Sequence, residues 1–238
     1  MMVEIHQKKL AFRTGVLMVA FGLALLNPSL LEMLFFLDLG LFRFHHLLWL
    51  LLMLGMFQVF IPAFNDHVSC GRMFAKHYTP SAHSYTQEQL EDSVRRNNRG
   101  ALRAAMVWLV VLSLIGWFRW SGWLGNRGIH LLVVFFYFAD EFCINVWCPF
   151  RVWIVRNTCC NTCRIFNWGH FMMFSPYLFL PQFWTWSLLA VSTAILIQWE
   201  IMNARHSHRF SILSNAKLQC VNCLQARCRY MQQRRLEA

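Results

Sequence analysis

Runs of apolar residues that are long enough to cross a lipid bilayer dominate this sequence. A helix rises about 1.5 Å per residue, so about 20 mainly apolar residues span the hydrocarbon core. The 238 residues are 57% hydrophobic and 14% charged, whereas about a quarter of the residues in a typical soluble domain are charged. The sequence therefore predicts an all-α integral membrane protein.

Prolines and charged loops divide the apolar residues into about six transmembrane helices. The expected spans are residues 10–26, 41–64, 101–120, 129–150, 165–182 and 183–202. They form a helical transmembrane bundle over residues 1–202, followed by a basic, Cys-rich cytoplasmic tail over residues 203–238. This tail and the connection before the fifth span predict a short Cys-rich cap on the cytoplasmic face.

The fifth expected span is short and contains Pro176 and Pro181, so it is either a full crossing or a re-entrant segment. Basic residues discriminate between these alternatives, because Lys and Arg collect on the cytoplasmic side of membrane proteins. With six crossings, only Arg43, Arg119 and Arg127 of the 22 Lys and Arg residues lie outside. The charges therefore favour a full crossing, with both termini cytoplasmic and the protein in a bacterial inner membrane.

The net charge of +11 follows from the same loops and does not indicate nucleic-acid binding. No soluble segment combines basic and aromatic residues in the way that single-stranded nucleic acid requires. The expected partners are the lipid bilayer and a cytoplasmic redox or docking protein.

Nine cysteines gather at or just within the expected cytoplasmic face, where thiols are kept reduced. The tail places three of them at metal-ligand spacing, and a structural zinc ion or an iron–sulfur cluster needs about four donors. The candidate ligands are Cys148, Cys159, Cys160, Cys163, Cys220, Cys223 and Cys228. An iron–sulfur cluster, a zinc ion and thiols without metal remain alternatives.

Two adjacent acids, Asp140 and Glu141, lie inside the fourth expected span, and Cys143 follows them in the same stretch. Helical spacing puts Glu141, Asn145 and Cys148 on one face. If this span ends at residue 150, Glu141 lies about 14 Å from its cytoplasmic end. An ionisable group at that depth is a candidate functional site.

Two readings of these acids remain open. In the functional reading, Glu141, Asn145 and Cys148 relay a proton or a cation. In the structural reading, an acid pairs with an arginine of a neighbouring span, but Arg103 and Arg119 both lie near span ends.

Histidines mark the expected outer ends of two spans. His45 and His46 open the second span, and His130 opens the fourth. Two such residues from facing helices could ligate a haem. Interfacial histidines without a cofactor are the alternative.

Three functions fit these patterns, and the sequence leaves open whether the chain is an enzyme. The first is a redox or electron-transfer subunit with an iron–sulfur or zinc site at the cytoplasmic face. The second is a transporter of protons or a soft metal cation that uses Asp140, Glu141 and Cys148. The third is a non-catalytic scaffold with a zinc-stabilised tail. Hydrolase motifs such as G-x-S-x-G and H-E-x-x-H are absent from the sequence.

Overall fold

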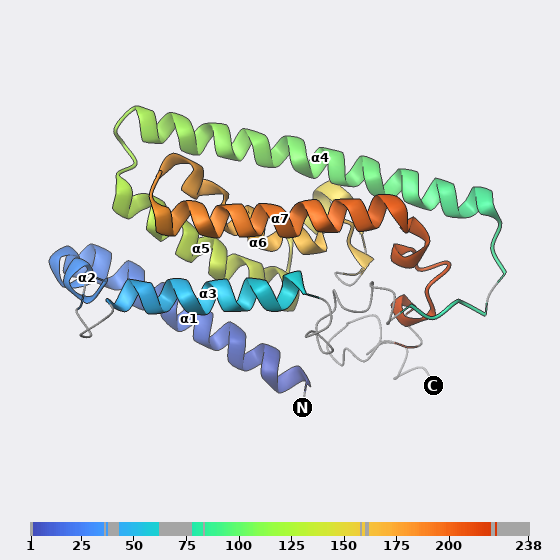
Figure 1. The fold of residues 1–238 in the computed structure, drawn as a ribbon, viewed down its shortest axis with the longest axis horizontal. Helices are drawn as coiled ribbons and strands as arrows, with labels where there is room; N and C mark the ends of the chain where they lie inside the picture. The colour runs from blue at the N-terminus through green and yellow to red at the C-terminus, as the bar shows by residue number, and fades with distance from the viewer. Residues whose placement is uncertain are drawn as a thin grey trace.

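The computed structural model describes residues 2–35, 37, 43–61, 78–82, 84–157, 159, 162–219 and 222. In this part of the chain the expected all-α fold is confirmed, and β pairing is confined to an isolated bridge. The α-helices (Figure 1) are α1 (Met2–Leu26), α2 (Pro28–Phe35), α3 (Phe44–Phe60), α4 (Gln87–Trp120), α5 (Asn126–Asn145), α6 (Gly169–Phe174) and α7 (Phe183–Arg205). The shorter helices are the π-helix η4 (Phe150–Val155) and the 3₁₀-helices η6 (Phe166–Trp168), η7 (Ser175–Phe179), η8 (Ser207–Phe210) and η9 (Ala216–Leu218).

Four of the described helices are long and apolar enough to cross a membrane. They are residues Gln7–Leu26 of α1 together with α4, α5 and α7. Helix α3 is apolar too, but its 17 residues are fewer than the expected span 41–64. It ends early because Ile61 has extended backbone angles and precedes Pro62, and a proline disfavours helical geometry in the residue before it. Residues 62–64 lie outside the described residues.

The outward faces of these helices carry large apolar side chains. Leu25 on α1, Leu102 on α4 and Phe183 on α7 are 81%, 64% and 69% exposed. A soluble monomer rarely exposes contiguous apolar surface on this scale, because water contact with such surface is unfavourable. These faces are compatible with an integral membrane protein whose helices contact lipid.

The helices alternate in direction along one bundle axis. In Figure 1, α1 and α4 run one way and α3, α5 and α7 run the other, with α3 beside α7. The main packed core lies between α3, α5, α6, η7 and α7. Its buried apolar residues are Met53, Met56, Ile129, Val133, Met173, Phe174, Tyr177, Leu180, Leu188 and Ile195. Helix α1 lies outside this core and packs mainly against α5.

The fifth expected span forms a broken helix that returns the chain along the bundle. Its first end is fixed by Gly169, which lies against the Asp140 carboxylate near the end of α5. Its other end is fixed by Tyr177, whose hydroxyl lies 3.2 Å from Nδ1 of His130 near the start of α5. Residues 169–177 therefore run antiparallel to α5 over ten of its residues, or about 15 Å.

Helix α4 is longer than the expected third span, residues 101–120, because it begins at Gln87 and continues into that span without a break. Thr86 caps its first turn by accepting a hydrogen bond from the Gln89 backbone N–H at 3.2 Å. The 34 residues extend about 51 Å, which exceeds the thickness of a bilayer core by about 20 Å. About the first third of α4 therefore extends beyond the length that a bilayer core would accommodate, and this end projects past the other helices in Figure 1.

The described part of the tail folds back onto the chain that leads into α4. Thr79 and Ser81 pair with it through backbone hydrogen bonds of 2.8 Å to Ala216 and 2.9 Å to Ser214. Asn215 between them is fully buried, and its side chain donates to the Arg209 carbonyl at 2.8 Å. These contacts build the described portion of the cap expected at this end of the bundle.

Gly100 gives a test of the packing between α4 and η4. A Cβ at this position would lie 3.1 to 3.2 Å from side-chain and backbone atoms of Val155, whereas a Cβ at Gly22 on α1 meets nothing within 4 Å. We expect Gly100→Leu to lower the free energy of unfolding in detergent by about 1–3 kcal/mol through overpacking. Gly22→Leu is the matched control, because both changes improve helix propensity equally. Equal stability of the two variants would contradict this packing.

Candidate functional site

The two acids of α5 converge on an arginine from α1. Nη1 of Arg13 donates to Asp140 Oδ2 at 2.9 Å and to the Tyr137 carbonyl oxygen at 2.7 Å. Its Nη2 lies 3.4 Å from Glu141 Oε2, and the guanidinium stacks 4.2 Å from the centre of the Tyr137 ring. Although Asp140 and Glu141 point about 100° apart around α5, the forked guanidinium reaches both.

Glu141 is the most deeply buried charged residue of this cluster, at 3% exposure. Besides its contact with Arg13, its Oε1 accepts a hydrogen bond of 2.9 Å from Nδ2 of Asn145. The same amide group donates to the Glu141 carbonyl oxygen at 2.8 Å. The expected neighbourhood of Glu141 and Asn145 is therefore present, one helical turn apart on α5.

Asp140 fits against the backbone of α6. A Cβ at Gly169 would lie 2.4 Å from Asp140 Oδ1, so the carboxylate approaches this closely because the residue is a glycine. The next residue, His170, lies within electrostatic reach of both Asp140 and Arg13. The cluster thus joins three elements, α1, α5 and α6, and holds three groups that can accept a proton.

The depth of the cluster differs from the sequence expectation. Helix α5 ends at Asn145 rather than at residue 150, because Pro149 cannot continue an α-helix. Glu141 is therefore four residues, or about 6 Å, from the end of its helix rather than about 14 Å. The acids lie near one end of the bundle and not at its middle.

Cys148 lies beyond the end of α5 and contacts a second thiol. The Cys143 thiol donates a hydrogen bond to its sulfur, and the Arg151 backbone N–H donates another at 3.4 Å. The bond from Cys143, the N–H groups of Arg151 and Phe150 and the Arg151 charge lower the pKa of Cys148 to about 6, although burial opposes this. The thiol pair therefore contains one sulfur that is ionised at neutral pH.

Of the other cysteines, only Cys159 and Cys163 belong to the described residues. Cys163 is buried against Ala101 and Ala104 of α4, and Cys159 is half-buried in the preceding turn. Four of the predicted metal ligands, Cys160, Cys220, Cys223 and Cys228, lie outside the described residues. Within the described residues, no three His, Cys, Asp or Glu side chains are grouped closely enough to hold a metal ion.

The three histidines proposed as haem ligands do come together, at the opposite end of α5. The ring centres of His45 and His46 lie 4.1 Å apart. The Phe35 ring packs at 5.4 Å from His45 and 5.5 Å from His130. A haem between these two helices would have to displace Phe35, so the arrangement does not fit the group.

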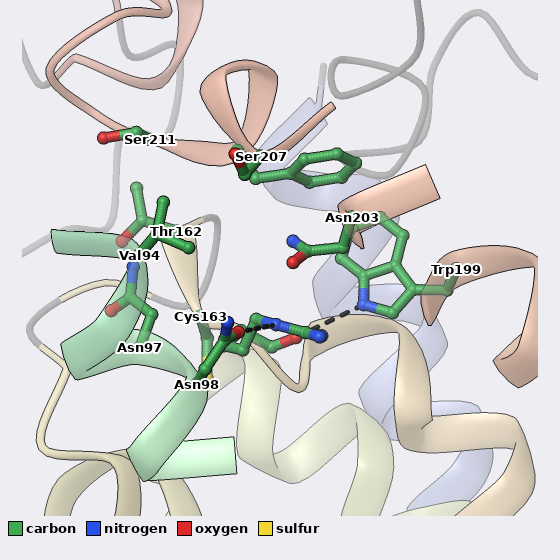
Figure 2. Close-up of a pocket in the computed structure, with 11 residues that line it drawn as sticks. Val94, Asn97, Asn98, Thr162, Cys163, Trp199, Asn203, Ser207 and Ser211 are labelled. Carbon is green, nitrogen blue, oxygen red and sulfur yellow. Dashed lines mark hydrogen bonds between the residues drawn. The ribbon is translucent and has the colours of Figure 1, made fainter. Parts of the chain in front are cut away.

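A polar pocket lies at the same end of the bundle as the acid cluster, between α4, the 162–164 turn and α7 (Figure 2). Arg164 anchors it, with Nη groups 2.8 and 2.5 Å from the two Glu200 carboxylate oxygens and Nε 3.0 Å from Asn98 Oδ1. Its volume of about 20 Å³ has room for about one water molecule. The pocket joins α4 to α7 and is too small for an organic ligand.

Arg13 is the site residue that sequence reasoning missed. The arginines considered as partners for the acids were Arg103 and Arg119, near the ends of other spans. The available signal was the position of Arg13 inside the expected span 10–26, where a charged residue calls for a partner in another helix.

Comparison with known proteins finds no matching family model, no matching curated protein and no matching solved structure.

Removing Arg13 should destabilise the fold strongly. The Arg13→Gln variant leaves two poorly exposed carboxylates without their cation, which typically costs about 3–5 kcal/mol. Arg127→Gln is the matched control, since Arg127 pairs with the exposed Glu32 and such pairs contribute less than about 1 kcal/mol. Denaturant unfolding in detergent measures both.

Neutralising the acids should restore stability in the absence of Arg13. We expect the triple variant Arg13→Gln, Asp140→Asn and Glu141→Gln to unfold at a higher denaturant concentration than Arg13→Gln alone, because no unpaired charge remains. Additive losses from all three changes would show that the ion pairs do not couple.

The pKa of Cys148 predicts selective alkylation. A thiolate is the reactive form, so iodoacetamide should label Cys148 with a half-maximal rate near pH 6 and with a falling rate below that pH. Cys163, at 5% exposure, is the internal control and should label slowly throughout. Peptide mass mapping separates the two sites, and a rate for Cys148 that rises only above pH 8 would contradict the assignment.

Proposed function

We propose that this chain is a polytopic membrane protein that transports protons, with Glu141 as the group that binds and releases the proton. One observation carries the proposal: two adjacent carboxylates share one arginine in a poorly exposed cluster. With Arg13, Asp140 and Glu141 all ionised, the cluster carries a net charge of −1, and one added proton makes it neutral. Net charge is costly at low dielectric, and an ionisable group inside a membrane bundle is a candidate for proton binding.

Geometry favours Glu141 over Asp140 as the proton carrier. Asp140 is held closely by Arg13 and by the Gly169 backbone, whereas the Arg13 contact to Glu141 is 0.5 Å longer (3.4 against 2.9 Å). Protonating Glu141 therefore acts on the longer of the two Arg13 contacts and leaves the pair of Arg13 and Asp140 intact. His170, within electrostatic reach of Asp140 and Arg13, is a further group to which the proton could pass.

The proposal includes six membrane crossings. They are α1, α3, residues 101–120 of α4, α5, residues 163–179 and α7. It is supported by the alternating directions of these segments, by their exposed apolar surface and by the antiparallel course of residues 169–177 along α5. The Lys and Arg distribution then puts both termini and the acid cluster on the cytoplasmic side.

Transport across the bilayer needs a second proton site near the outer face. His130 and Tyr177 supply a candidate, eleven residues from Glu141 along α5, or about 16 Å. Between the two sites lie Val133 and Phe174, both buried in the apolar core. A proton path therefore requires either water entry or a movement of α6 and η7 against α5.

The test is proton flux into liposomes that contain the purified protein and an entrapped pH-sensitive dye. With a potassium diffusion potential as the driving force, we expect acidification above the rate of protein-free vesicles. Glu141→Gln should remove most of that excess, because the amide has nearly the same size and keeps one acceptor oxygen but cannot take up and release a proton as a carboxylate does. Glu32→Gln, which removes an exposed carboxylate near the other end of the bundle, should leave the flux unchanged.

Two results would overturn the proposal. One is a wild-type flux that equals the leak of empty vesicles under both polarities of potential. The other is a Glu141→Gln protein that remains folded and transports as fast as wild type.

The cysteine metal site remains a prediction. An iron–sulfur cluster or zinc ion would need ligands from the tail, whose cysteines lie outside the described residues. Metal and acid-labile sulfide analysis of anaerobically purified protein tests this redox function, and the docking partner that it would need, separately from proton flux.

A further inference from the structure

The end of α5 carries two thiols in direct contact. Cys143 belongs to the last turn of the helix, and Cys148 follows three residues after its end. The two sulfurs share a hydrogen bond and are both half-buried, so small reagents can approach them from outside the bundle. The backbone N–H groups of Arg151 and Phe150 donate to the Cys148 sulfur, which suits Cys148 to the thiolate role in this pair.

We propose that Cys143 and Cys148 form a redox-active dithiol that closes to a disulfide by exchange with a small-molecule disulfide. The Cys148 thiolate attacks one sulfur of the incoming disulfide, forms a mixed disulfide and releases the first small thiolate. Cys143 then loses its proton, attacks the Cys148 sulfur and expels the second small thiolate. The protein dithiol loses two electrons and two protons, and the small disulfide becomes two thiols.

Backbone geometry supports this assignment of attacking and resolving thiols. The Arg151 N–H at 3.4 Å and the Phe150 N–H stabilise negative charge on Cys148. Cys143 stands already within hydrogen-bond reach of that sulfur, which is the position that a resolving thiol needs. On the proposed topology the pair faces the cytoplasm, where a disulfide is transient and serves catalysis or sensing.

Closing the disulfide requires a small movement at the end of α5. A sulfur–sulfur bond is about 2.05 Å long, shorter than any hydrogen-bond contact between thiols. The residues between the two cysteines include Val146, which caps the end of α5, and both Val146 and Trp147 are exposed. The connection can therefore adjust without disturbing the packed core.

The dithiol is independent of proton transport, although Cys143 lies two residues from Glu141. Its chemistry can be read by mass mapping whether or not the protein moves protons. Absence of proton flux would therefore contradict only the proton-transport proposal. Absence of disulfide exchange would contradict only the dithiol proposal.

The experiment uses the full-length, reduced protein in detergent, titrated with oxidised glutathione and quenched with acid. After alkylation of the remaining thiols, peptide mapping should find a Cys143–Cys148 disulfide that dithiothreitol reverses. Cys143→Ser should stop at a glutathione adduct on Cys148, and Cys148→Ser should lose both products. Cys163→Ser should behave as wild type.

A wild-type protein that accumulates the Cys148 adduct as fully as Cys143→Ser would overturn the proposal, because Cys143 would then not resolve it. A disulfide from Cys148 to any other cysteine would overturn it as well. Wild-type mapping decides the question alone if a serine variant fails to fold.

Discussion

The contact between Arg13 and the two acids of α5 is the interaction on which the arrangement of the bundle depends. None of the apolar stretch of α1 is buried inside the protein, and its packing partner in the bundle is α5. Apolar contacts with lipid would be equally favourable if α1 lay elsewhere, since lipid tails are as apolar as leucine. The ion pairs give α1 a defined register against α5, so the same residues position a helix and form the acid cluster.

Two residues with unusual backbone properties place this site. Gly169 lets the Asp140 carboxylate reach the backbone of α6, which ties the returning segment to α5. Pro149 ends α5 soon after the acids, which brings them to one end of the bundle beside the thiol pair. Neither residue carries reactive chemistry, yet each determines what surrounds the groups that do.

The helical class and the apolar segments were predictable, because a run of about 20 apolar residues can satisfy its own backbone hydrogen bonds in lipid only as a helix. The closeness of Glu141 and Asn145 was predictable as well, since they lie one helical turn apart. The contact between Cys143 and Cys148 was not predicted, because Cys148 lies beyond the end of α5. The partner Arg13 was not found, because pairing between α1 and α5 depends on a tertiary contact across 127 residues of sequence. The break of the fifth span and the unbroken course of α4 also depend on packing, as at Tyr177 and Gly100, and not on local propensity.

The length of α4 has a mechanical consequence. A helix that runs without interruption from the bilayer core to a region about 20 Å beyond it behaves as a stiff rod. A tilt of about 10° within the membrane would move its far end by about 3 Å by simple lever geometry, within the range of tilts that transmembrane helices adopt. At this far end, Gln87 and Leu90 line a groove together with Ser207 at the start of η8, whereas Asn98, nearer the bundle, accepts a hydrogen bond from Arg164. A tilt of α4 would therefore displace its far end relative to η8 more than it displaces Asn98.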